Sequence, residues 1–73
     1  SQRTTRDKLI SYLSEQAKQN NSSKFEIPFN RQQLADFLSV DRSAMSNELG
    51  KMRDEGLLMF ERNRFELLLK EDI

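Results

Sequence analysis

The hydrophobic positions in the first part of the chain recur at the spacing of one amphipathic helix over residues 4–20. A spacing of three and four residues is typical of one helix face, and the positions are Leu9, Ile10, Leu13 and Ala17, with Tyr12 beside them. Thr4 followed by Asp7 can form a capping box at the start of this helix. The polar run at 20–23 ends the pattern and predicts a loop.

A second, shorter helix is predicted over residues 30–38. Asn30 favours a helix start, and Gln33 can return a hydrogen bond to the backbone of the cap. The apolar positions predict a buried stripe made of Leu34, Phe37 and Leu38. Ala35 is small enough for a close crossing with the next helix, and Val40 in the turn that follows can fill the corner between them.

A third helix is predicted to begin after Asp41, whose carboxylate can accept hydrogen bonds from the free amides of the first turn. Its inward face is expected to consist of side chains at i, i+4 and i+7, namely Met45, Leu49 and Met52. Gly56 suits the left-handed residue that ends a helix. Two short helices joined by a tight turn over 30–56 indicate a helix-turn-helix.

Three short apolar segments, 25–29, 57–60 and 65–69, have the composition of strands. Pro28 confines the first to a sheet edge or a strand end, and residues 61–64 have the composition of a hairpin turn. The order helix, strand, helix, helix, strand, strand predicts a mainly α (α+β) winged helix-turn-helix. We expect three helices with a small antiparallel sheet, in a single domain over residues 1–73.

The composition excludes several classes of function. Hydrophobic content is 36% and charged content 33%, which is typical of a folded domain on the polar side. The chain has no cysteine and no histidine, so disulfides, zinc knuckles and imidazole catalysis are excluded within it. Neighbouring acids such as Asp54 and Glu55 diverge and form no catalytic dyad, so we expect no enzyme and no cofactor or metal in this domain. No apolar run spans a membrane, and the lack of cysteine fits a cytoplasmic protein.

The net charge is zero, which at first argues against a nucleic-acid partner. The charge is segregated, however. Residues 1–53 carry nine Lys and Arg against six acids, whereas residues 54–73 carry three against six. A mildly positive side is therefore expected, with weak DNA binding by one copy and higher affinity from two.

The outer side of the third helix carries small polar residues, which a helix pressed against base edges requires. At about 100° per residue, Ser43 and Asn47 point away from the packing face, and Arg42 and Ser46 lie on its flank. Only the first turns of a recognition helix usually reach base edges, so the candidate base contacts are Arg42, Ser43, Ser46 and Asn47. Gly50 weakens the helix by roughly 1 kcal/mol relative to alanine, which close approach of a phosphate or another element would explain. The alternative is an ordinary solvated helix face.

Contacts to the DNA backbone are predicted from two other places. Arg31 and Gln32 lie in the first turn of the second helix, where free amides favour an anion. Arg62 and Arg64 lie in the predicted hairpin turn and could reach phosphates. The alternative for these two arginines is a solubilising role in the turn.

At these residues the chain resembles the C-terminal DNA-binding domain of Crp/Fnr-family bacterial transcription regulators. The matching segments are 30–38, 40–46 and 53–57, together with Leu49, the helix before them and the turn at 63–65. By position, Arg42, Ser43, Ser46 and Asn47 match the family's base contacts, and Arg31 and Gln32 match its backbone contacts. Many relatives have arginine where this chain has Asn47, so the half-site is expected to differ from the usual one.

The resemblance implies a longer protein, which agrees with a first residue that is serine rather than methionine. Family members carry an N-terminal jelly-roll sensor domain for an effector and a long dimerisation helix. The implied partners are a palindromic double-stranded DNA site, a second copy of the chain in a homodimer, and RNA polymerase. The competing hypothesis is a winged helix used for protein–protein interaction, which zero net charge and the acidic C-terminal segment favour.

Overall fold

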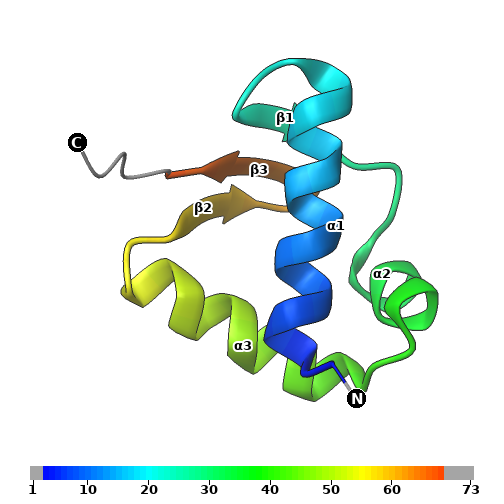
Figure 1. The fold of residues 1–73 in the computed structure, drawn as a ribbon. Coiled ribbons are helices and arrows are strands. Elements are labelled where there is room, and N and C mark those ends of the chain that lie inside the picture. The colour runs from blue at the N-terminus through cyan, green and yellow to red at the C-terminus, as the bar shows by residue number, and fades with distance from the viewer. Residues whose placement is uncertain (1–2, 69–73) are drawn as a thin grey trace.

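The computed structural model describes residues 3–68 and confirms the winged helix. In chain order its elements are α1 (Thr5–Asn20), β1 (Lys24–Glu26), α2 (Arg31–Leu38), α3 (Arg42–Asp54), β2 (Leu58–Glu61) and β3 (Arg64–Leu67). Figure 1 shows α1 standing between the sheet and α2, while α3 crosses beneath it. The two helices of the helix-turn-helix pack against each other, and α3 also packs against α1.

Each helix begins at the residue that its sequence predicts. The Thr4 hydroxyl accepts from the Asp7 amide at 3.1 Å, and Asp7 accepts from the Thr4 amide at 3.3 Å. Asn30 and Gln33 form the second capping box, at 2.8 and 2.9 Å. The Asp41 carboxylate accepts from the Ala44 amide at 2.9 Å. These local bonds satisfy amides that have no partner within the helix and so fix where α1, α2 and α3 start.

The three strands form one antiparallel sheet in the order β1-β3-β2. Phe65 in the central strand lies opposite Phe25 on one side and Phe60 on the other. The first strand ends at Glu26, before the proline, and is shorter than the predicted 25–29. Glu61 and Arg64 pair across the hairpin, so the turn is narrower than predicted. Residue 69, the predicted end of the last strand, lies outside the described residues.

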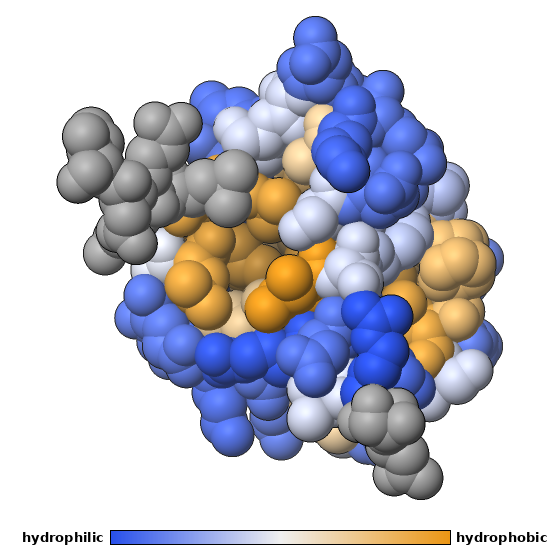
Figure 2. Space-filling view, viewed as in Figure 1, coloured by the Kyte–Doolittle hydropathy of each residue, from blue (hydrophilic) through white to orange (hydrophobic). Residues whose placement is uncertain are grey.

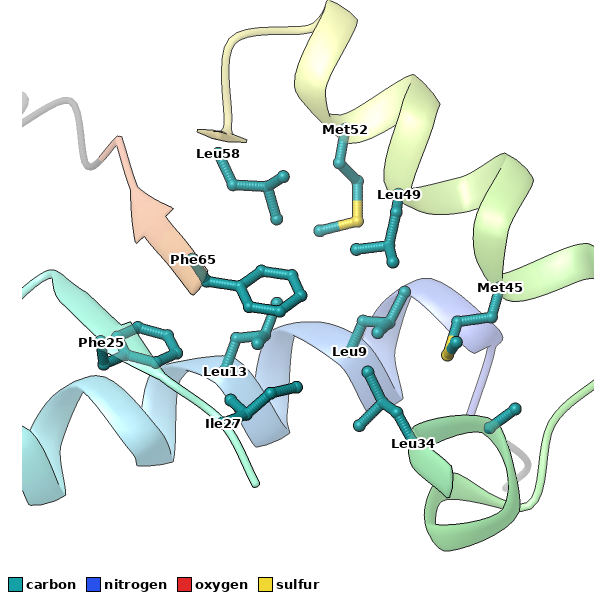
Figure 3. Packing of buried hydrophobic residues seen from close by; sticks show 11 residues of the cluster. Leu9, Leu13, Phe25, Ile27, Leu34, Met45, Leu49, Met52, Leu58 and Phe65 are labelled. Atoms are coloured by element: carbon teal, nitrogen blue, oxygen red, sulfur yellow. The ribbon is translucent and has the colours of Figure 1, made fainter. Parts of the chain in front are cut away.

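The core lies where α1 and α3 meet the sheet (Figure 3). The predicted inward face of α3 is confirmed, because Met45, Leu49 and Met52 are at most 2% exposed. Ala35 is buried at the crossing of α2, also as predicted. The remaining buried side chains come from every other element: Leu9, Leu13, Phe25, Ile27, Leu34, Leu58 and Phe65.

The prediction that Phe37 is buried is wrong. It is 59% exposed and packs edge-on against Tyr12, with ring centroids 5.5 Å apart. The buried side of α2 is centred on Leu34 and Ala35, and at 100° per residue Phe37 points about 110° away from the middle of that side. Leu34 and Ala35 are the buried residues of this eight-residue helix, so it buries a narrower stripe than its apolar positions suggest.

Apolar surface also remains open beside α1. A hollow of about 330 Å³ lies between α1, the end of α3 and the sheet, with Ile10, Leu57 and Leu68 among its lining residues. Figure 2 shows apolar surface in a hollow bordered by hydrophilic side chains. Ile10 is 44% exposed there, so this member of the predicted α1 stripe is only partly covered. Within residues 3–68 no helix is long and apolar enough to cross a membrane.

Candidate nucleic-acid interface

The outer side of α3 is open, as its sequence predicts. Arg42, Ser43, Ser46 and Asn47 are all exposed; Ser43 and Asn47 point away from the core residues of the same helix, and Arg42 and Ser46 lie on its flank. The preceding turn sets this orientation: Ser39 is left-handed at φ 58°, and the Val40 amide donates to the Ala35 carbonyl at 3.0 Å. The polar side chains are therefore held away from the domain's interior by the packing of the helix itself.

A polar hollow of about 540 Å³ lies beside the N-terminal end of α3. It is formed by the N-terminal ends of α2 and α3 and by the hairpin turn, and its lining residues are Pro28, Phe29, Asn30, Arg31, Gln32, Arg42, Arg62 and Asn63. Four of the eight predicted DNA contacts, from three separate segments, meet here. The other four do not line it: Ser43, Ser46, Asn47 and Arg64.

Arg31 is held at the edge of this hollow by aromatic packing. Its guanidinium carbon lies 5.1 Å from the centre of the Phe65 ring and 5.3 Å from that of Phe60. Burial, and then the nearby charge of Arg42, lowers the pKa of Arg31, although a guanidinium stays protonated in proteins. Within residues 3–68 neither Arg31 nor Arg42 forms a salt bridge. An anion placed between these two cations would relieve their repulsion.

Arg62 in the hairpin turn adopts a backbone conformation that is unfavourable for arginine. Arg62 is left-handed at φ 55°, a conformation that Gly or Asn adopts more readily. Asn63 ties this turn to the chain after β1, since its side chain donates to the Ile27 carbonyl at 3.1 Å and its carbonyl accepts from the Ile27 amide at 2.9 Å. The sequence indicated a turn here but not the positioning role of Asn63.

Arg64 lies apart from the other candidate contacts. In the sheet register it is opposite Glu26 on β1 and opposite Glu61 on β2. Two carboxylates therefore flank its charge on the outer face of the sheet. Arg62 shares a small hollow with Arg64, Glu26 and Glu61, but unlike Arg64 it also lines the hollow beside α3.

Two further arginines were not singled out by sequence reasoning. Arg6 donates to Glu48 at 2.5 Å and, through both terminal nitrogens, to Glu55 at 2.8 Å, which ties α1 to α3. These bonds raise the pKa of Arg6 and lower the pKa of Glu55. Arg53 lies over the Phe60 ring at 5.2 Å. Arg53 follows Arg42 by eleven residues, or three helical turns, and this spacing could have predicted that both lie on the same side of α3.

The described part of the chain holds no cluster of three or more potential metal ligands. A family model described as the Crp-like helix-turn-helix domain matches residues 7–72. The chain belongs to this family. The resemblance noted from the sequence is thereby confirmed, and no match to a curated protein was found. This Crp-like domain binds double-stranded DNA in transcription regulation.

Proposed function

We propose that this Crp-like domain reads a specific sequence by inserting the N-terminal half of α3 into the major groove. Base edges would be contacted by Arg42, Ser43, Ser46 and Asn47, which are all exposed on that half of the helix. The observation that carries the proposal is the hollow beside them. It gathers Arg31, Arg42 and Arg62 from three segments, and within residues 3–68 none of the three forms a salt bridge.

The lining of the hollow supports two different roles for the predicted contacts, one with phosphates and one with bases. Arg31, Gln32 and Arg62 lie where a phosphate next to an inserted α3 would pass, so they set the position of the helix. Arg42 lies between these groups and the base-reading side of α3, where a forked donor can pair with guanine. The role of Arg64 as a backbone contact stays a prediction. Glu26 and Glu61 lie opposite Arg64 in the sheet and weaken its attraction for phosphate.

Asn47 gives the proposed reader its own base preference. A short amide can pair with both edge groups of adenine, whereas a forked cation favours guanine. The serines at 43 and 46 are short and adaptable, so they admit close approach without selecting one base strongly. We therefore expect a half-site that depends on Arg42 and Asn47 more than on either serine.

We further propose that the domain acts within an effector-responsive regulator that binds a palindromic site as a homodimer and meets RNA polymerase there. This rests on the family and on the small positive surface. One domain of zero net charge gains few phosphate contacts, so two linked copies would supply the affinity.

The deciding experiment is fluorescence anisotropy with the intact protein, its effector and DNA from its own promoter. Arg42→Ala is expected to abolish specific binding while the circular dichroism spectrum stays unchanged. Lys18→Ala is the matched control, because Lys18 is an exposed cation at the far end of α1. Unchanged binding by Arg42→Ala would show that α3 is not the reader.

The salt dependence of the same binding curves separates DNA reading from the alternative of protein–protein interaction. Release of counterions from phosphates makes log K fall steeply and linearly with log salt concentration. A steep slope supports the proposal. A shallow slope, together with a protein partner recovered by pull-down, would favour the alternative.

A further inference from the structure

One aromatic ring in the sheet carries two guanidinium groups from different helices. The guanidinium carbon of Arg31, from α2, lies 5.3 Å from the centre of the Phe60 ring, and that of Arg53, from α3, lies 5.2 Å from it. Guanidinium groups at this distance are attracted to the ring face. Phe60 is half-buried and belongs to β2, so it links the sheet to both helices of the helix-turn-helix.

Arg53 continues the cationic flank of the proposed reading helix. At 100° per residue, Arg42, Ser46 and Arg53 lie within about 40° of one another on α3. The Arg53 guanidinium turns back along the helix toward Gly50, since a Cβ built at Gly50 would have Nη2 of Arg53 as its nearest neighbour, at 4.0 Å. The group is thereby directed along the helix rather than away from its end.

The remaining contacts of Arg53 leave it able to bind an anion. Its side chain is 47% exposed, and its salt bridge in the described residues is to Asp54, at 3.8 Å and with Asp54 77% exposed. An exposed pair at that distance contributes little and is readily exchanged. A guanidinium resting on a ring keeps its N–H edge free, and that edge matches two oxygens of a phosphate.

We infer that Arg53 is a further phosphate-binding residue, and that Phe60 is a positioning residue that orients both Arg31 and Arg53 toward the DNA backbone. This inference rests on the proposed insertion of α3 into the major groove. It adds a contact on the C-terminal half of α3, where the sequence prediction had none. The ring positions each arginine without a close carboxylate partner, and so leaves both charges available to DNA.

The test measures affinity of the intact protein for its promoter DNA over a series of salt concentrations. Arg53→Ala is expected to weaken binding about fivefold to tenfold and to reduce the slope of log K against log salt by about 0.9, the value for one lost phosphate contact. Discrimination between promoter and unrelated DNA should stay the same, because a phosphate contact carries no sequence information. Lys18→Ala is again the control and should leave both the affinity and the slope unchanged.

The role of Phe60 is tested with Phe60→Leu and Phe60→Tyr. The leucine variant removes the ring and is expected to weaken binding at least as much as Arg53→Ala, while the tyrosine variant retains the ring and wild-type affinity. In an Arg31→Ala, Arg53→Ala background the leucine change should have no further effect on DNA affinity, because its action passes through those two arginines. A further loss in that background, with a lower melting temperature, would assign Phe60 a purely structural role and overturn the positioning part.

The same set of variants separates the two proposals. If Arg42→Ala abolishes specific binding while Arg53→Ala keeps the wild-type salt slope, the inference about Arg53 is overturned and the proposed function stands. If neither variant changes binding, the proposed function itself fails.

Discussion

Two groups of charged residues around the helix-turn-helix differ in how their arginines are paired: the paired group is Arg6 with two glutamates, and the open group is Arg31 with Arg42. Arg6 on α1 is bonded to Glu48 of α3 and to Glu55, which follows α3 directly. Arg31 and Arg42 lie close enough for one to lower the pKa of the other, yet within residues 3–68 neither forms a salt bridge. The charge of Arg6 is neutralised within the domain, whereas the charges of Arg31 and Arg42 remain available to bind DNA.

The difference is informative because leaving cations together is unfavourable in the isolated domain. Like charges repel, and partial burial of Arg31 adds a desolvation cost. Carboxylates were available: Asp41 precedes Arg42 directly, but its oxygen caps α3 instead. The rings of Phe60 and Phe65 hold Arg31 in place, a role that a carboxylate could also have filled. An arrangement that is unfavourable without a ligand is common at functional sites.

The largest expected effect comes from removing the open group. Arg31→Ala combined with Arg42→Ala should weaken promoter binding on the order of 100-fold and so remove the preference for the promoter over unrelated DNA, since a phosphate contact and a base contact are lost together. Stability should be unchanged or higher, because the repulsion between the two charges disappears. Binding is measured by anisotropy and the melting temperature by circular dichroism. A large loss of stability would mean that these arginines serve the fold, as Arg6 does.

Substitution of Asp41, the N-terminal cap of α3, should have the next largest effect. Asp41→Ala is expected to lower the free energy of unfolding by about 1 kcal/mol, because the Ala44 amide loses its acceptor. Asp41→Asn keeps an acceptor oxygen and removes a negative charge near the proposed phosphates. It should therefore retain most of the stability and bind DNA at least as tightly as the wild type. Chemical denaturation and anisotropy on both variants check this, and weaker DNA binding by the asparagine variant would contradict it.

What the sequence predicted well depends on bonds between near neighbours. The caps at Thr4, Asn30 and Asp41 each involve residues three positions apart, so residue type and spacing suffice. The inward face of α3 followed from helical periodicity for the same reason. The exposure of the predicted base contacts then needed no information beyond that periodicity.

What the sequence did not predict depends on how distant segments meet. Arg6 is separated from Glu48 and Glu55 by 42 and 49 residues, so no local pattern links them. Phe37 was misjudged because the rest of the domain covers only the side of α2 around Leu34 and Ala35, and which side is covered depends on how the helices pack together. The cluster of Arg31, Arg42 and Arg62 likewise arises only when α2, α3 and the hairpin come together. Arg64 shows the converse, since its neighbours Glu26 and Glu61 become apparent only from the sheet register.

A smaller effect, on stability alone, is expected for the paired group. Arg6→Ala should lower the melting temperature modestly, because three hydrogen bonds from α1 to α3 and its C-terminal cap are lost and two carboxylates are left without their cation. DNA affinity at a temperature where the variant is folded should equal that of the wild type. Lys8→Ala on the same helix is the control, since Lys8 forms no salt bridge in the described residues. Weaker DNA binding without a loss of stability would erase the distinction between the two arginine groups.

The smallest effect should be seen in the pH dependence of the paired group. Hydrogen bonds from Arg6 lower the pKa of Glu55 in the folded state below its ordinary value. The folded state thus binds a proton less readily than the unfolded state. The stabilising contribution of Glu55 is complete above the unfolded pKa and is lost as the pH falls through the folded pKa. The melting temperature of Glu55→Gln should therefore lie below that of the wild type from pH 6 to 8, and the gap should close in acid below about pH 4.

Glu15→Gln supplies the baseline, because Glu15 is an exposed carboxylate without a salt bridge in residues 3–68. A gap for Glu55→Gln that stays constant into acid would mean that Arg6 and Glu55 are not coupled in solution, and that Glu48 alone pairs with Arg6.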